Sequence, residues 1–259
     1  MTAPDPKPKR RPPASLFALG HAALPAEVSA LGVTYQFVKL FKHDFFAATG
    51  LYERADGVGN RLAVLKVQRT YPYFGWPMRW LGRRIASREI RIYQKLQNVP
   101  GIPKFLGAVG PTGFLHEFIP GTELAPQLPL SPQFFADLER LFKNLHEHHI
   151  AYVDANKREN ILFGDDGHPW LIDFQISYEC AKGARANYFS RRMLQKLIRA
   201  DWYHFYKHKT RLIPKSCQPE DFHRAQDRGF WHRMHRRFSR PLIKFRRRLL
   251  SRYDLANTR

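Results

Sequence analysis

The first half of the chain alternates apolar and polar residues in short runs, which is the period of half-buried β-strands. The runs lie at residues 35–40, 49–53, 62–67, 104–109 and 113–119. The run at 62–67 is almost continuously apolar, as is typical of a buried strand. Asp56-Gly57 precedes it and is a turn signal. The pattern predicts a β-rich N-terminal half.

Two stretches follow the helical period instead. Between residues 83 and 96 the apolar side chains fall roughly on one face, and Asn98-Val99-Pro100-Gly101 ends the pattern. Ser131-Pro132 suits a helix N-cap followed by proline at the first helical position. From there apolar residues recur at intervals of three and four up to Leu145, and the chain beyond Ala186 is helix-like and basic. We therefore expect one helix in the first half and a mainly helical second half.

These elements divide the chain into three parts of an α+β fold. Residues 1–15 are rich in proline and charge and are expected to form a disordered tail. Residues 16–120 carry the predicted strands and their helix, and residues 121–259 carry the helical part with its basic C-terminal segment. Pro120-Gly121 breaks the chain between the last two parts.

Composition narrows the class of protein. Hydrophobic residues make up 44% of the chain and aromatic residues 14%, which is enough for a real core. No apolar run approaches the ~18 residues of a membrane-spanning helix, and no apolar stretch follows the basic N-terminal residues as in a secretory signal. Cys180 and Cys217 match neither a disulfide framework nor a zinc motif. We expect a reduced, cytoplasmic protein.

The net charge of +21, from 43 Lys and Arg against 22 Asp and Glu, favours anionic partners. Nucleotide, phosphorylated sugar lipid, anionic membrane and RNA all fit this charge. Basic and apolar residues alternate between residues 222 and 252, and this segment is interpreted as a peripheral contact with the inner face of a membrane, an RNA-binding segment or a solvated helix. The aromatic and basic residues at 71–84 fit either a water–lipid interface or packing against the strands.

Polar residues with a shared chemistry stand in a fixed order along the chain. Lys66 lies in the apolar strand, Glu89 on the helix after it, Asp154 and Asn160 in a loop, and Asp173 directly after Trp170-Leu171-Ile172. Phosphoryl transfer requires such a set, because a lysine must reach the phosphates, side-chain oxygens must hold magnesium and a carboxylate must orient the attacking hydroxyl. A carboxylate buried behind an apolar strand also requires a partner or a metal.

In this order the motifs resemble those of the protein-kinase-like superfamily, over about residues 33–180. The segments that carry the resemblance are Val64-Leu65-Lys66, Glu89, Leu145-His146 with 149–154, Glu159-Asn160-Ile161-Leu162 and Leu171-Ile172-Asp173-Phe174-Gln175. The resemblance implies a two-lobed kinase fold, with a small β-rich N-lobe and a mainly helical C-lobe, that binds ATP and Mg²⁺ in the cleft.

The resemblance also implies a role for each matching residue. Lys66, fixed by Glu89, would contact the phosphates, and the backbone of Glu117, Phe118 and Ile119 would meet the adenine. The metal would be held by Asn160 and Asp173. The acceptor hydroxyl would be oriented by Asp154.

Several positions depart from the superfamily pattern. Tyr152-Val153 replaces the usual His-Arg before Asp154, and Asn160 follows Asp154 by six residues where five are usual. The segment 42–48, where a glycine-rich loop is expected, contains no glycine. These departures point away from eukaryotic-type protein kinases. The overall look is similar to small bacterial kinases of the lipopolysaccharide inner-core (Kdo/heptose) group.

Other functions stay open on the sequence alone. The acceptor is either a lipopolysaccharide core sugar or a protein Ser/Thr. The glycine-free segment and Tyr152-Val153 also fit a pseudokinase scaffold that binds partners through its basic surface, and an RNA-binding protein is a third alternative. His204 and His208 are four residues apart and are expected on the polar face of a helix rather than at a metal.

Overall fold

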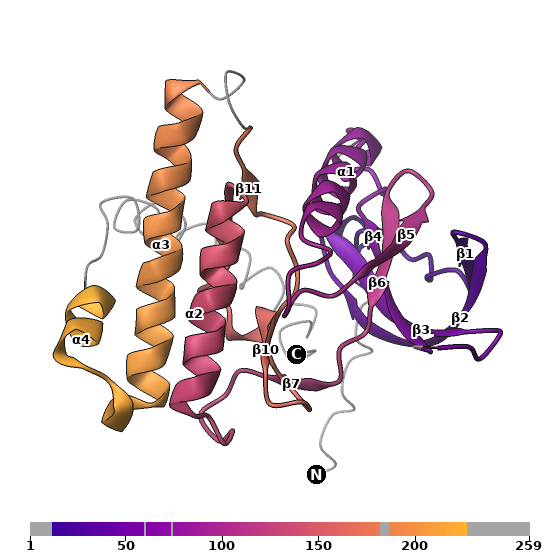
Figure 1. Ribbon diagram of the computed structural model, residues 1–259. Coiled ribbons are helices and arrows are strands. Elements are labelled where there is room, and N and C mark those ends of the chain that lie inside the picture. The colour runs from indigo at the N-terminus through magenta and orange to yellow at the C-terminus, as the bar shows by residue number, and fades with distance from the viewer. Residues whose placement is uncertain (1–11, 60, 74, 182–186, 227–259) are drawn as a thin grey trace, which may run out of the picture.

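The structure is a computed structural model that describes residues 12–59, 61–73, 75–181 and 187–226 of the chain. It is a mixed α and β structure with a β-rich N-terminal part and a helical C-terminal part, as the sequence pattern predicts (Figure 1). Most of the basic segment at 222–252 lies outside the described residues. No helix in the described ranges has the length and apolar character needed to cross a bilayer.

Six antiparallel strands form the sheet of the N-terminal part, in the order β1-β2-β3-β4-β6-β5. The strands are β1 (Glu27–Ala30), β2 (Val33–His43), β3 (Ala47–Arg54), β4 (Leu62–Gln68), β5 (Phe105–Val109) and β6 (Gly113–Glu117). All five predicted runs coincide with strands β2 to β6, although the last two residues of the run at 113–119 follow β6. The sequence pattern missed the short edge strand β1.

Strand β4 lies in the interior of this sheet, between β3 and β6. Lys66 pairs in register with Thr49 of β3 and Phe114 of β6, and its side chain is buried. A lysine buried at this position has little contact with water, so its charge needs partners inside the protein.

Helix α1 (Arg79–Lys95) packs against the sheet through one buried face formed by Gly82, Ala86, Glu89 and Tyr93. These residues are three and four apart, which places them on a single stripe of the helix. The helix begins four residues before the predicted start at residue 83. At Gly82 the helix lies so close to the preceding segment that an added Cβ would be 2.1 Å from the Arg69 carbonyl oxygen.

The described residues of the C-terminal part form three α-helices and two small sheets. The helices are α2 (Pro132–Glu147), α3 (Tyr188–Leu212) and α4 (Pro219–Gln226). Strands β7 (Gly121–Glu123), β9 (Ile161–Gly164) and β10 (Pro169–Leu171) form one sheet, and β8 (Ile150–Ala151) pairs with β11 (Tyr178–Glu179). As predicted, Ser131 caps α2, and its Oγ accepts a hydrogen bond from the Phe134 N–H at 3.1 Å. Single-turn 3₁₀ helices lie at Ala14–Leu16, Arg158–Asn160 and Pro214–Ser216.

One apolar core connects the two parts of the chain. From the N-terminal part it includes Tyr93 of α1 and Phe114 of β6. From the C-terminal part it includes Leu145 of α2, Phe205 of α3, and Phe174 in the loop after β10. The Phe174 ring lies 5.1 Å from the Tyr93 ring, in edge-to-face contact. Because this core is continuous, α1 and the segment after β10 are held in fixed positions relative to each other.

The first described residues are folded against the sheet. Residues 12–15 were assigned to the disordered tail, but they lead into the 3₁₀ turn at Ala14–Leu16. The Ser15 carbonyl accepts a hydrogen bond from Arg69 at 2.9 Å, and the Phe17 carbonyl accepts another at 3.3 Å. The buried guanidinium of Arg69 therefore sets where this segment joins the fold.

We predict that Gly82→Ala destabilises the protein, although alanine is the better helix former by about 1 kcal/mol. The added methyl group would collide with backbone atoms of Arg69, and overpacking of this kind costs about 1–3 kcal/mol. The urea midpoint should fall for this variant. Ser87→Ala on the exposed face of the same helix is the control, and it should change stability by less than about 0.5 kcal/mol. A stabilised Gly82→Ala variant would contradict the observed packing.

Candidate active site

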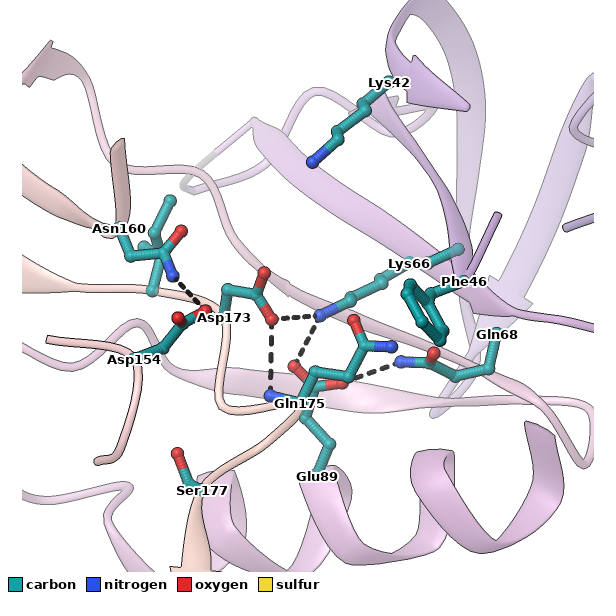
Figure 2. Close-up of polar contacts among 12 residues, drawn as sticks. Lys42, Phe46, Lys66, Gln68, Glu89, Asp154, Asn160, Asp173, Gln175 and Ser177 are labelled. Carbon is teal, nitrogen blue, oxygen red and sulfur yellow. Dashed lines mark hydrogen bonds and ion pairs between the residues drawn. The ribbon is translucent and has the colours of Figure 1, made fainter. Parts of the chain in front are cut away.

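A buried lysine joins three segments of the chain. The Nζ atom of Lys66 donates hydrogen bonds to Glu89 Oε1 and to Asp173 Oδ1, each at 2.7 Å (Figure 2). Glu89 comes from α1 and Asp173 from the loop after β10. The structure therefore brings together three of the residues that the sequence singled out.

The ion pairs decide the charge states of this group. Burial opposes the charge of the Lys66 ammonium, but Asp173 and Glu89 outweigh burial and raise its pKa. Burial also opposes the charge of Asp173, yet Lys66 lowers the pKa of this carboxyl to about 2. For Glu89, burial dominates and raises the pKa to about 7 despite the contact with Lys66. At neutral pH the Lys66–Asp173 pair is fully ionised.

Additional contacts fix the carboxylate of Glu89 and the loop beside it. Gln68 Nε2 donates to Glu89 Oε2 at 2.8 Å, so both oxygens of this carboxylate have partners. Arg88 of α1 donates to the carbonyl oxygen of Gln175. These bonds tie α1 to the segment that carries Asp173, and the sequence pattern had identified neither Gln68 nor Arg88.

A second polar group lies on the loop between β8 and β9. Asn160 Nδ2 donates to Asp154 Oδ2 at 2.9 Å, and Lys157 Nζ lies 2.7 Å from the same oxygen. The extra residue between Asp154 and Asn160 is absorbed in the 3₁₀ turn at Arg158–Asn160, so the two side chains still meet. The sequence pattern did not identify Lys157 as part of this group.

Each aspartate keeps one oxygen without a partner among the described residues. For Asp154 the engaged atom is Oδ2, and for Asp173 it is Oδ1, which also accepts the Gln175 N–H at 3.3 Å. In Figure 2 the amide oxygen of Asn160 points away from Asp154. The site thus presents two carboxylate oxygens and one amide oxygen that other groups can use.

The backbone around both aspartates is strained and held by specific bonds. Asp173 has φ of 63° and Val153 has φ of 69°, in the left-handed region that β-branched residues in particular avoid. The Tyr152 hydroxyl donates to the Ile172 carbonyl oxygen and lies 3.2 Å from that of Asn160. Tyr152 stands where the superfamily has histidine, and its phenol connects the Asp154 loop to the Asp173 loop.

Asp201 on α3 anchors the Asp154 loop from behind. Its Oδ2 accepts the Tyr152 N–H at 2.7 Å and its Oδ1 accepts the Val153 N–H at 2.8 Å. The ring of His146 donates to the same carboxylate at 3.1 Å. Asp201 is fully buried, and its role could not be recognised from sequence because it acts on backbone groups about fifty residues away.

The expectation that His204 and His208 lie on a polar face is wrong. Both are buried, at 4% and 5% exposure. His208 Nε2 donates to the Ala155 carbonyl oxygen at 2.9 Å, which holds the loop directly after Asp154. Burial lowers the pKa of His208 to about 4, so its ring is neutral at physiological pH.

Within the segment 42–48, residues 44–46 form the turn between β2 and β3, and the Asp44 side chain closes this turn. Asp44 Oδ1 accepts the N–H groups of Phe46 at 2.8 Å and Ala47 at 3.0 Å, which closes the turn. The Arg69 guanidinium stacks on the Phe45 ring at 4.0 Å. Lys42, near the end of β2, places its Nζ atom 3.1 Å from Asp44 Oδ2. The turn is therefore fixed by side chains instead of being free to flex.

The strand end predicted to meet adenine is only partly available. The Glu117 and Phe118 N–H groups donate to the carbonyl oxygens of Lys104 at 2.9 Å and Leu62 at 3.2 Å. The Glu117 carbonyl oxygen accepts from His116 Nδ1 at 2.8 Å. The Phe118 ring stacks on Phe41 of β2 at 6.1 Å. Binding of adenine at Glu117, Phe118 and Ile119 stays a prediction, with Ile119 N–H as its donor.

Comparison with known proteins was informative only at the level of structure. The chain matches no protein-family model and no curated protein. It is similar to the crystal structure of the Rio2 kinase from Chaetomium thermophilum, with a TM-score of 0.50 and 15% sequence identity. The chain has a kinase-like fold. The similarity covers 75% of this chain and 64% of the Rio2 kinase chain, so it extends over less than two thirds of that protein.

We predict that stability falls as the pH drops below about 6.5, because His116 and His208 are buried and neutral in the folded state. Burial lowers the pKa of each to about 4, whereas an unfolded histidine titrates near 6.5. The stabilisation is complete above the unfolded pKa and is lost as the pH falls toward the folded pKa. His208→Gln retains a donor for Ala155 and should flatten the plot of urea midpoint against pH between 7 and 5.

The control is His168→Gln, which changes an exposed histidine. Glu89, which also titrates near pH 7, is present in every variant and therefore cancels in the comparison. Equal pH slopes for wild type and His208→Gln would contradict the buried neutral state of His208.

We predict that Asp201→Asn loosens the Asp154 loop more than it destabilises the whole protein. An amide offers one acceptor oxygen for two buried N–H donors, and an unpaired buried donor costs about 1–3 kcal/mol. Hydrogen exchange of the Tyr152 and Val153 amides should become faster in this variant. The increase should be larger than for amides that exchange only when the whole protein unfolds. Asp221→Asn, which breaks the Lys209 ion pair on α4, is the matched control and should leave these two amides protected.

Proposed function

We propose that the chain is an ATP- and Mg²⁺-dependent phosphotransferase that acts on a hydroxyl group. The observation that carries this proposal is the pair of half-engaged carboxylates. Asp154 and Asp173 are each held through one oxygen by donors of the protein, while the other oxygen makes no hydrogen bond to a described residue. Both oxygens of the buried Glu89 carboxylate, by contrast, have partners within the protein.

Lys66 supplies the fixed positive charge that phosphate oxygens require. Its ammonium stays protonated at neutral pH because Asp173 and Glu89 raise its pKa despite burial. Glu89 and Gln68 hold the lysine side from α1, so the charge is positioned before substrate binds.

The remaining oxygens suit magnesium, which prefers hard oxygen ligands. Asn160 would contribute its amide oxygen and Asp173 its free carboxylate oxygen. When bound, the metal neutralises charge on the phosphates of ATP. Asn160 is oriented for this role because its Nδ2 group is used by Asp154, which turns the amide oxygen outward.

Asp154 would orient the acceptor hydroxyl and take up its proton. Its Oδ2 atom is fixed by Asn160 and Lys157, so the unpartnered Oδ1 is the atom that can accept a hydrogen bond from a hydroxyl. Asp201 and His208 hold the backbone on either side of Asp154, which keeps this oxygen in position. The adenine would lie against the strand end at Glu117–Ile119.

For the acceptor, we propose a sugar hydroxyl of an anionic lipopolysaccharide core precursor, and a two-lobed kinase of the inner-core group as the protein class. The net charge of +21 supports an anionic acceptor. The Tyr152-Val153 replacement supports a site without the arginine that would bind a phosphorylated activation loop. A protein Ser/Thr is the second acceptor to test, because the residues at the reaction centre fit either hydroxyl.

We predict that two aspartate variants separate binding from chemistry. Asp173→Asn should lose the magnesium dependence of ATP binding, because a metal ligand and the partner of Lys66 are changed together. Asp154→Asn should keep magnesium-dependent ATP binding but reduce phosphate transfer by roughly a hundredfold or more, as expected for loss of a general base. Calorimetric titration with ATP, with and without Mg²⁺, and transfer of labelled phosphate measure the two properties.

Asp165→Asn, in an exposed turn, serves as the control for both variants. Wild-type turnover in Asp154→Asn or Asp173→Asn would contradict the proposed reaction. ATP binding without magnesium dependence, and without transfer to sugar, protein or water, would identify the chain as a pseudokinase instead.

A further inference from the structure

Two tryptophans near the start of α1 are exposed to solvent. Trp76 is 75% exposed and Trp80 is 57% exposed. The backbone N–H of Trp76 donates to the Tyr73 carbonyl oxygen, and the Trp76 carbonyl oxygen accepts the Tyr73 N–H, each at 3.0 Å. The Tyr73 ring itself packs against Phe45 at 5.1 Å. Packing against the strands therefore explains Tyr73 but leaves the two indoles without an internal role.

Arginines surround these tryptophans without acidic partners. Arg79, Arg83 and Arg84 are exposed and form no ion pair with any residue in the described part of the chain. The sequence between Asp56 and Glu89 contains no Asp or Glu. Trp80, Arg83 and Arg84 are three and four apart, so they share one face of α1. The start of this helix is both apolar and uncompensated in charge.

The start of α3, in the other half of the chain, also presents exposed aromatic side chains. Tyr188 is 66% exposed and Phe189 is 78% exposed, and Met193, one turn after Phe189, is 41% exposed. Arg191 and Arg192 lie between them on the exposed surface. No Asp or Glu occurs between Glu179 and Asp201. The pairing of exposed aromatic rings with arginine is thus repeated at a second place.

Both places lie toward the same side of the molecule in the view of Figure 1. In Figure 1, α1 and α3 each begin at the upper edge, and α4 lies at the opposite end of α3. We use the name aromatic–basic edge for the exposed residues Trp76, Trp80, Arg83 and Arg84 at the start of α1 together with Tyr188 and Phe189 at the start of α3. Two separated contacts on one edge fit an extended surface better than a small ligand.

We propose that the aromatic–basic edge docks on the surface of an anionic lipid bilayer. Indole and phenol rings are stabilised at the water–lipid boundary, where the ring is desolvated while its polar atom stays hydrated. The arginines then lie at the level of the lipid phosphates, which supply the negative charge that the protein surface lacks. This inference goes beyond phosphate transfer, because it concerns where the protein is held and does not depend on ATP or magnesium.

The experiment is flotation of the full chain with phosphatidylglycerol-containing vesicles and with neutral phosphatidylcholine vesicles. The full chain should bind the anionic vesicles at low salt, and tryptophan emission should shift to the blue and be quenched by brominated lipid. Trp76→Ala/Trp80→Ala should abolish the quenching. It should also weaken vesicle binding about tenfold or more, because two apolar anchors are removed from the lipid interface. Arg83→Gln/Arg84→Gln should weaken binding about fivefold for each arginine, since each contributes about 1 kcal/mol near an anionic surface.

Two controls match the changes in chemistry. Phe222→Ala removes a 40% exposed aromatic ring from α4 at the opposite end of α3, and Arg140→Gln/Lys143→Gln removes two exposed charges from α2. Both controls should bind vesicles like the wild type. Charge in the segment after residue 226 can attract vesicles by itself, but it is unchanged in all variants.

Binding by Trp76→Ala/Trp80→Ala that equals the wild type, or equal loss in the controls, would overturn the proposal. So would preferential binding of single-stranded RNA that displaces the vesicles and leaves tryptophan unquenched, which would assign the same residues to base stacking. Calorimetric ATP binding by the same variants should be unchanged. If the wild-type chain binds ATP but does not bind anionic vesicles, this inference fails and the proposed function stands. If it binds the vesicles but not ATP, the proposed function fails and this inference stands.

Discussion

The arrangement of this site depends on the cost of burying the Lys66 ammonium. A buried charge without partners is strongly unfavourable, and the Lys66 side chain, on the interior strand β4, is only 8% exposed. Its two carboxylate partners come from α1 and from the loop after β10, so satisfying one charge fixes the relative position of three segments. The shared apolar core, with Phe174 against Tyr93, supports the same arrangement from below.

Helix α3 provides the second constraint, and it acts on backbone rather than on the reacting groups. Asp201 and His208, two turns apart, bond to the chain immediately before and after Asp154. The hydrogen bond from the Val153 N–H to Asp201 helps to offset the strain of the left-handed backbone conformation at Val153. Asp154, the proposed proton acceptor, is therefore positioned by α3, and substitutions in α3 should change the position of its carboxylate.

The departures from the kinase pattern preserve geometry by other means. Asp44 closes the β2–β3 turn with its side chain where glycines would normally allow it to form, and Arg69 fastens that turn to the first folded residues. Tyr152 replaces a histidine yet still joins the loops of Asp154 and Asp173 through its hydroxyl. At both places, side-chain hydrogen bonds fix the backbone conformation.

The sequence by itself determined the elements and the order of the polar residues. Strand and helix periods depend on local spacing, so β2 to β6, α1 and the Ser131 cap of α2 followed from the pattern. The tertiary structure alone decided the partners of Asp201 and the burial of His204 and His208. A local pattern carries no information about which distant carbonyl or carboxylate a side chain will meet. That choice is made when α3 packs behind the Asp154 loop and burial removes water as the alternative partner.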